Sequence, residues 1–116
     1  MTTPQLAVQR LSADLAVAPQ LAPKALAAAA AQGFRSVINN RPDFEGGPDQ
    51  PTSAAMEAAA RAAGLGYAHL PVAPGYQSPD EIARFRELLA TLPRPILAFC
   101  RSGTRSGKLY RAATEG

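Results

Sequence analysis

Short apolar runs alternate with longer helix-type segments along most of the chain. Four of these runs have the length and the flanking loop residues that are typical of β-strands. They cover residues 14–18, 34–38, 67–70 and 96–99. Residues 1–12 carry no clear periodicity, so we expect an irregular lead-in there.

Helical segments separate these strands and follow the last one. The sequence predicts helices over 23–32, 54–63, 78–92 and 106–113. The clearest start is at Ser78, because the Ser-x-x-Glu spacing to Glu81 allows a reciprocal capping box. Thr52 or Ser53 can cap the second helix, and Gly33 ends the first one.

This alternation predicts an α/β fold in a single domain over residues 1–116. We expect a small, mainly parallel sheet of about four strands flanked by helices. Ligands of such sheets bind beyond the carboxyl ends of the strands. The loops at 39–43 and 72–77 and the segment beginning at Cys100 all follow strands, so we expect them to meet at one edge.

Charge is placed unevenly along the chain. The formal net charge is only +3, too small and scattered to predict nucleic-acid binding. Residues 88–114, however, contain no acidic residue and several basic ones: Arg94, Arg101, Arg105, Lys108 and Arg111. This segment surrounds the cysteine, so a small anionic substrate is expected there.

Cys100 is the single cysteine, which excludes an intramolecular disulfide framework and fits a reducing compartment. The first residues have no signal-peptide pattern, and no apolar run approaches the ~18 residues of a membrane span. We therefore expect a cytoplasmic protein without a membrane partner. Because there is one histidine and one cysteine, no metal site and no cofactor are expected.

Cys100 comes directly after a predicted strand and just before a predicted helix. This geometry directs backbone N–H groups and the positive end of the helix dipole at one point. A thiol there loses its proton more easily than one with an ordinary pKa of about 8.5. We assign Cys100 as a nucleophile and Arg105 as its anion-gripping partner. The remaining candidate anion-binding residues of the loop are Arg101, Ser102, Gly103, Thr104 and Ser106.

The segment FCRSGTRS resembles the active-site loop of rhodanese sulfurtransferases, in which four residues separate Cys and Arg. It also resembles the phosphate loop of cysteine-dependent phosphatases, which has five residues there. Together, GFRSVINNRPD, GLGYAHLPV and PRPILAFCRSGTRS resemble the phosphatase-like domain of beta-lactamase hydrolase-like proteins over residues 5–113. The resemblance implies a dual-specificity-phosphatase fold, sulfur-transfer roles, and a functional link or fusion to a persulfide-dioxygenase-type metallohydrolase.

Three departures from the phosphatase pattern favour sulfur chemistry. Arg105 comes one residue early, and Phe99 replaces the histidine that phosphatases usually place before the cysteine. The loop PVAPGYQ holds no carboxylate where these phosphatases carry a general acid, which leaves Asp43 as the only candidate acid. The main hypothesis is a sulfurtransferase that works through a Cys100 persulfide, with thiosulfate or a persulfide as donor.

Three alternatives stay open. The first is a phosphatase that acts on a phosphoester through a Cys100 phosphoenzyme. The second is a non-catalytic module that binds an anion or a phosphorylated partner. The third is a redox sensor based on Cys100, although the chain holds no second cysteine to resolve a sulfenic acid.

Overall fold

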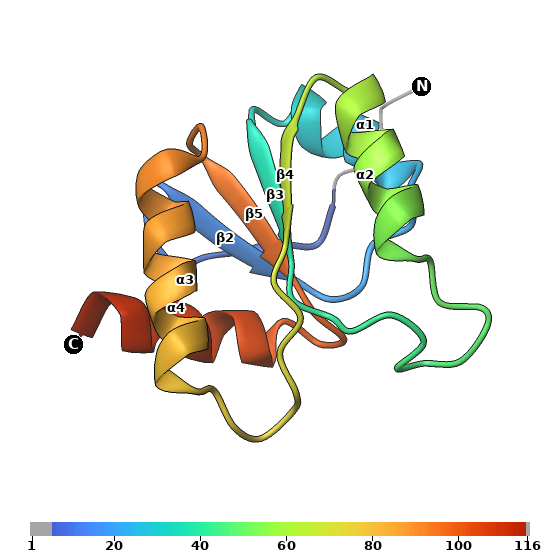
Figure 1. Ribbon diagram of the computed structural model, residues 1–116. Coiled ribbons are helices and arrows are strands. Elements are labelled where there is room, and N and C mark those ends of the chain that lie inside the picture. The colour runs from blue at the N-terminus through green and yellow to red at the C-terminus, as the bar shows by residue number, and fades with distance from the viewer. Residues whose placement is uncertain (1–5, 116) are drawn as a thin grey trace.

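A central five-stranded sheet with two helices on each face makes up the computed structural model, which describes residues 6–115 (Figure 1). The strands are β1 (Gln9–Arg10), β2 (Leu15–Ala18), β3 (Ser36–Asn39), β4 (Gly66–His69) and β5 (Ile96–Phe99). The helices are α1 (Ala25–Ala31), α2 (Ser53–Ala62), α3 (Pro79–Thr91) and α4 (Thr104–Glu115). The sheet order is β1-β2-β5-β3-β4, and all pairings except β1 with β2 are parallel. The predicted α/β class is confirmed.

Strand β1 was not predicted from the sequence. Gln9 and Arg10 pair antiparallel with Val17 and Ala16 and extend the sheet beyond the four expected strands. Both residues are exposed, so they carry no apolar signal, and pairing with β2 alone makes them a strand. The part of the expected lead-in that falls on residues 1–5 lies outside the described residues.

Local capping chemistry explains where the helices start. Ser78 and Glu81 form the predicted capping box: the Glu81 N–H donates to Ser78 Oγ at 3.1 Å, and the Ser78 N–H donates to Glu81 Oε1 at 2.8 Å. Thr52 caps α2 by accepting from the Ala55 N–H. Helix α4 begins at Thr104, two residues earlier than predicted, so the cysteine loop is short.

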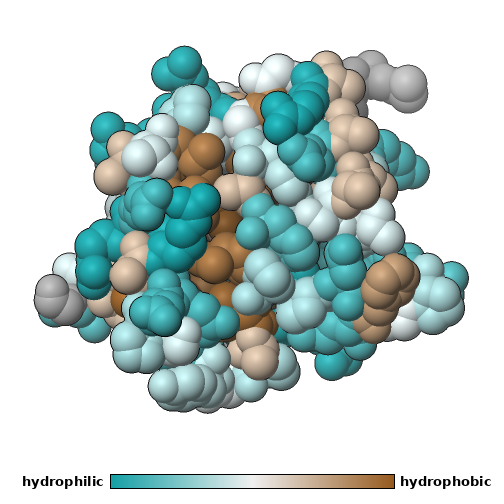
Figure 2. Space-filling model, viewed as in Figure 1, coloured by the Kyte–Doolittle hydropathy of each residue, from teal (hydrophilic) through white to brown (hydrophobic). Residues whose placement is uncertain are grey.

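The sheet separates two apolar cores. Helices α1 and α2 cover one face, where Leu26, Met56 and Phe99 pack; α3 and α4 cover the other, where Phe85 and Leu109 pack. Strands β2, β3 and β5 are buried along their whole length, as expected for a parallel sheet covered on both sides. Figure 2 shows apolar side chains at the surface in the depression between α3 and β4, so the second core is covered incompletely.

Strand register brings the carboxyl ends of the central strands to the same level. Phe99 of β5 lies opposite Ala18 of β2 on one side and Asn39 of β3 on the other, and Asn39 lies opposite His69 of β4. The segments that follow these four strands therefore emerge together. This edge is the place where the sequence predicted the site.

Two features are absent from the described residues. No helix in this part of the chain has the length and apolar character needed to cross a membrane. Within residues 6–115, no three His, Cys, Asp or Glu side chains gather as a metal-binding group. The expectation that the protein uses no cofactor remains a prediction.

Candidate active site

Cys100 is the first residue after β5, at the centre of the sheet edge. Its N–H donates to the carbonyl oxygen of Ala18 at 3.4 Å, which ties the start of the loop to the end of β2. The residue is fully buried. The thiol is therefore placed by the two central strands rather than by a flexible surface loop.

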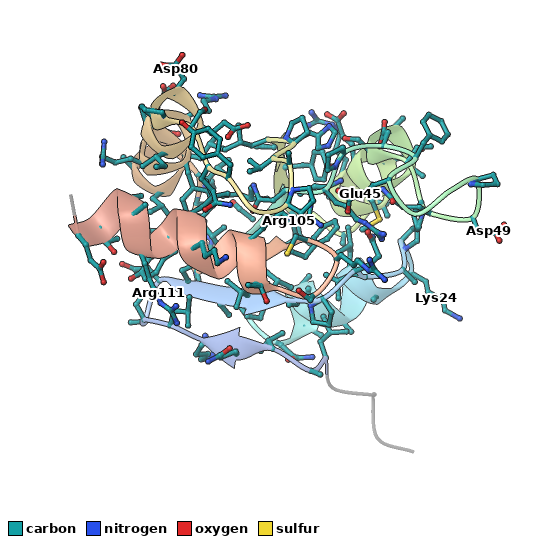
Figure 3. The ribbon with its side chains drawn as sticks, turned by 90° about the horizontal axis from the view of Figure 1, so that it is seen from below. Lys24, Glu45, Asp49, Asp80, Arg105 and Arg111 are labelled. Carbon is teal, nitrogen blue, oxygen red and sulfur yellow. The ribbon has the colours of Figure 1, made fainter. Side chains whose placement is uncertain are left out.

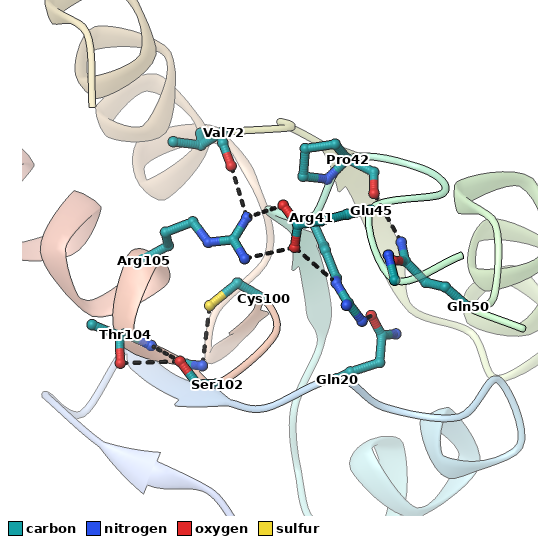
Figure 4. Close-up of polar contacts among 12 residues, drawn as sticks. Gln20, Arg41, Pro42, Glu45, Gln50, Val72, Cys100, Ser102, Thr104 and Arg105 are labelled. Carbon is teal, nitrogen blue, oxygen red and sulfur yellow. Dashed lines mark hydrogen bonds and ion pairs between the residues drawn. The ribbon is translucent and has the colours of Figure 1, made fainter. Parts of the chain in front are cut away.

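Gly103 turns the loop back over the sulfur. Its φ is +91°, and an added Cβ would lie 3.4 Å from the backbone of Ala18. A residue without a side chain fits this position with little strain. As a result, the Gly103 N–H donates to Cys100 Sγ at 3.0 Å (Figure 4).

The environment of Cys100 favours the thiolate. Burial by itself would raise the pKa of the Cys100 thiol, but backbone N–H donors outweigh burial and lower that pKa below its ordinary value. The donors are the N–H groups of Ser106, Ser102, Gly103 and Arg105. The loop therefore stabilises negative charge on the sulfur with main-chain groups, without the preceding histidine that phosphatases use.

Arg105 is buried beside this loop, and its guanidinium is held by residues from the segments after β3 and β4. Its Nη1 donates to Glu45 Oε2 at 2.8 Å and to the Val72 carbonyl oxygen at 2.9 Å, and its Nη2 donates to Glu45 Oε1 at 2.7 Å (Figure 4). These contacts use three of the five N–H donors of a guanidinium. Within residues 6–115, the Nε–H and one Nη2–H, which share one edge of the group, have no partner and can donate to two oxygens of an anion.

Glu45 is the functional candidate that sequence reasoning missed. It also accepts from Arg41 Nε at 3.0 Å, so two guanidinium groups share one carboxylate. The hydrogen bond from Arg105 is the main reason that the pKa of Glu45 is lowered, against the opposing effect of burial. A buried arginine needs a carboxylate partner, and this need could have pointed to an acid in the 39–53 loop. The loop holds three acids, however, and the sequence does not show which of them pairs with Arg105.

Asp43, the predicted acid, does not lie with Cys100 and Arg105. Its Oδ1 accepts the Ser53 N–H at 2.8 Å, and the side chain is exposed at the start of α2. This hydrogen bond connects the 39–53 loop to the first residue of α2. The contact is favourable because the positive end of the helix dipole attracts a carboxylate. The geometry thus brings Glu45, and not Asp43, into contact with Arg105, and the acid role of Asp43 remains a prediction.

Ser106 is buried, and its hydroxyl is already engaged. It donates to Asn40 Oδ1 at 2.8 Å, and Asn40 Nδ2 in turn donates to the Leu70 carbonyl oxygen at 3.0 Å. The hydroxyl therefore links α4 to the loops after β3 and β4, and its N–H serves the sulfur. Sequence reasoning gave Asn40 no role.

A cavity of about 290 Å³ opens over the loop. Its lining comes from the segments after β3, β4 and β5: Glu45, Pro74, Gly75, Arg101, Ser102, Thr104, Arg105 and Lys108. The predicted loop residues Arg101, Ser102 and Thr104 are exposed here, and the Ser102 hydroxyl donates to Thr104 Oγ1 at 3.1 Å. Within the described chain, Glu45 is the one carboxylate in this lining.

The chain matches a family of known proteins over nearly its whole length. The family model described as beta-lactamase hydrolase-like protein, phosphatase-like domain, matches residues 7–115. A beta-lactamase hydrolase-like protein of Xylella fastidiosa is 44% identical over 81 residues, which are 70% of this chain and 19% of that protein. One from Agrobacterium fabrum is 41% identical over 80 residues, or 69% of this chain and 18% of its own length. The chain thus spans about a fifth of these relatives.

Solved structures with the same fold include proteins described as phosphatases. A candidate phosphatase from Neisseria meningitidis has a TM-score of 0.85 and 34% identity, covering 97% of this chain and 80% of its own. A candidate phosphatase from Shewanella putrefaciens has a TM-score of 0.74 at 18% identity, over 94% of this chain and 68% of its own. A mutant form of Tk-PTP has a TM-score of 0.65 at 17% identity, over 93% of this chain and 79% of its own. The last two likenesses concern the fold alone.

Proposed function

This chain belongs to the phosphatase-like domain family of beta-lactamase hydrolase-like proteins, and we propose that within this frame it transfers sulfane sulfur through Cys100. The supporting observation is that the thiolate is stabilised while the one carboxylate in the described lining of the cavity is held in its ionised form. Glu45, the carboxylate in the described lining of the cavity, is bound by both Arg105 and Arg41 and has a lowered pKa. It therefore stays ionised at neutral pH.

A site without an acid suits a leaving group that departs as a stable anion. With thiosulfate, the Cys100 thiolate attacks the outer sulfur, the S–S bond to the sulfonate breaks, and its electron pair leaves with sulfite. The free edge of Arg105 and the loop N–H groups hold the anionic oxygens during this step. A nucleophile such as cyanide then takes the outer sulfur, and the electron pair returns to Cys100.

The loop size supports the same chemistry. Four residues separate Cys100 and Arg105, so the ring of N–H groups is one residue smaller than that of a phosphatase. Helix α4 starts at Thr104, which keeps this ring short. A single sulfur atom carried on Cys100 needs less room than a tetrahedral phosphoryl group.

Phosphoester hydrolysis is the second candidate, and the family and fold favour it. A Cys100 phosphoenzyme would use the same thiolate and the same arginine edge. Without a general acid, the release of an alkoxide or tyrosine phenolate is slower by on the order of 10²–10⁴. This version therefore predicts activity only on esters with good leaving groups.

Partners and location follow as part of the proposal. Because the chain covers about a fifth of its curated relatives, we propose a functional link or fusion to a persulfide-dioxygenase-type metallohydrolase. The cytoplasmic location also remains a prediction.

Side-by-side assays test the two activities. The purified protein is assayed for sulfur transfer from thiosulfate to cyanide and for hydrolysis of p-nitrophenyl phosphate, with Cys100→Ser as the inactive control. We expect transfer, together with a mass gain of one sulfur atom on Cys100 after treatment with thiosulfate. Arg105→Lys should weaken thiosulfate binding, because an ammonium does not reproduce the planar fork. Strong ester hydrolysis without sulfur transfer would reject the proposal.

A further inference from the structure

A second cavity lies outside the active-site pocket. It has a volume of about 500 Å³ and lies between α4 and the segment that carries β1. This volume is in the range of small-molecule sites. Its lining combines apolar and polar residues, and the apolar part includes Val8, Leu11, Val17, Ala18 and Pro19.

Two cations from α4 contribute to the polar part of this lining. Lys108 and Arg111 are three residues apart and therefore share one face of the helix. Neither forms an ion pair within residues 6–115. Figure 3 shows Arg111 on the side of α4 that faces the lower strands, whereas Arg105 and Glu45 point toward each other elsewhere. The cavity thus offers apolar surface together with uncompensated positive charge.

Gly107 is an independent sign that a ligand approaches α4 here. Glycine is an unfavourable residue in the interior of a helix. A Cβ at Gly107 would meet no atom within 4 Å, so nothing in the fold requires a glycine at this position. Gly107 lines the cavity although the residue itself is buried, and its missing side chain leaves space there that a ligand could fill.

The cavity adjoins the active-site pocket. Ser102, Thr104 and Lys108 line both, so the two cavities share part of their walls. A ligand that occupies the cavity can therefore extend one end past these shared residues into the active-site pocket.

We propose that the cavity binds the body of an organic thiol acceptor that has an aliphatic stem and a terminal carboxylate. The stem packs on the apolar floor beside Gly107, and the carboxylate pairs with Arg111 and Lys108. The acceptor role rests on the proposed function; the binding of an aliphatic carboxylate does not. Dihydrolipoate has the required chemistry, and octanoate represents its stem and carboxylate without the thiols.

The first experiment measures binding without turnover. Octanoate is titrated into the wild-type protein, and backbone amide shifts are followed by NMR. We expect saturable shifts in residues 7–11 and 102–111. Gly107→Leu, which fills the cavity, should lose about tenfold in affinity, the loss expected when roughly two methylene groups leave it. Arg111→Gln should also bind more weakly.

Matched controls separate the site from general effects. Ala58→Leu adds the same side chain at an exposed position of α2, and Arg84→Gln removes an exposed cation from α3. Both should bind octanoate like the wild type. Shifts that map elsewhere, or an affinity that Gly107→Leu leaves unchanged, would overturn the proposed site.

The second experiment tests the acceptor role. Sulfur transfer from thiosulfate is measured with dihydrolipoate and with cyanide as acceptors, and the ratio of their kcat/KM values is compared. In Gly107→Leu this ratio should fall by about tenfold. An unchanged ratio rejects the acceptor role. If no acceptor supports transfer while octanoate binds, the acceptor role falls with the proposed function and the binding site stands.

Discussion

Arg105 and Glu45 form a two-point ion pair between residues that are 60 positions apart in the chain, with N–O distances of 2.7 and 2.8 Å. The pair joins the start of α4 to the loop after β3. The Arg105 side chain is buried, at 8% exposure, and the Glu45 side chain is partly covered, at 21%. Glu45 therefore fixes the direction of the arginine, and the arginine keeps Glu45 ionised.

Glu45→Gln should destabilise the protein by about 1–3 kcal/mol, because it leaves two guanidinium groups without their carboxylate. The effect is measured by urea unfolding at pH 7. Glu57→Gln, which breaks the exposed pair with Arg61, is the matched control and should change stability by less than about 0.5 kcal/mol. Equal effects of the two substitutions would show that the Arg105–Glu45 pair stabilises the fold no more than an exposed surface ion pair does.

The same pair makes stability depend on pH in the acid range. The folded pKa of Glu45 is lowered, so its contribution is complete above the unfolded value of about 4.3 and is lost as pH falls through the folded pKa. We expect the stability difference between the wild type and Glu45→Gln to shrink below about pH 4. A difference that stays constant down to about pH 2.5 would contradict this account.

Alkylation of Cys100 should report its lowered pKa. The rate of reaction with iodoacetamide is expected to reach half of its plateau below about pH 8.5, the ordinary value for a thiol. Gly103→Ala should raise this midpoint and destabilise the fold by about 1–2 kcal/mol, because a φ of +91° strains alanine. An unshifted midpoint in a folded Gly103→Ala protein would mean that the Gly103 N–H does not stabilise the thiolate.

Ser106→Ala should cost about 1–3 kcal/mol, because it leaves the buried Asn40 Oδ1 without its donor. Ser102→Ala is the control, since the Ser102 hydroxyl is exposed, and its effect should stay within about 0.5 kcal/mol. Thermal unfolding of the two variants gives the comparison. Similar melting temperatures would argue that water replaces the Ser106 hydroxyl.

Gly107→Ala should stabilise the protein by up to about 1 kcal/mol, because alanine is the better helix former and its Cβ has open space. Chemical unfolding measures the gain. A loss of stability would show that α4 is more tightly packed at this position than the structure indicates.

Local chemistry in the sequence was sufficient for much of the fold. The apolar runs predicted four strands, and the capping box at Ser78 predicted the start of α3, because these signals act between residues a few positions apart. The short spacing from Cys100 to Arg105 likewise identified the loop that lowers the thiol pKa. Strand β1 was not predicted, because Gln9 and Arg10 become a strand only through pairing with β2.

The partners across the site were decided by the tertiary structure. Asp43 and Glu45 are two residues apart in one polar loop, and their local sequence does not distinguish them. Folding turns Asp43 toward the start of α2 and Glu45 toward Arg105. The cavity beside Gly107 likewise exists only because the β1 segment and α4 lie next to each other. By itself, the sequence determined four of the five described strands, two helix caps and the candidate nucleophile, whereas long-range packing determined which carboxylate, amide and cavity surround it.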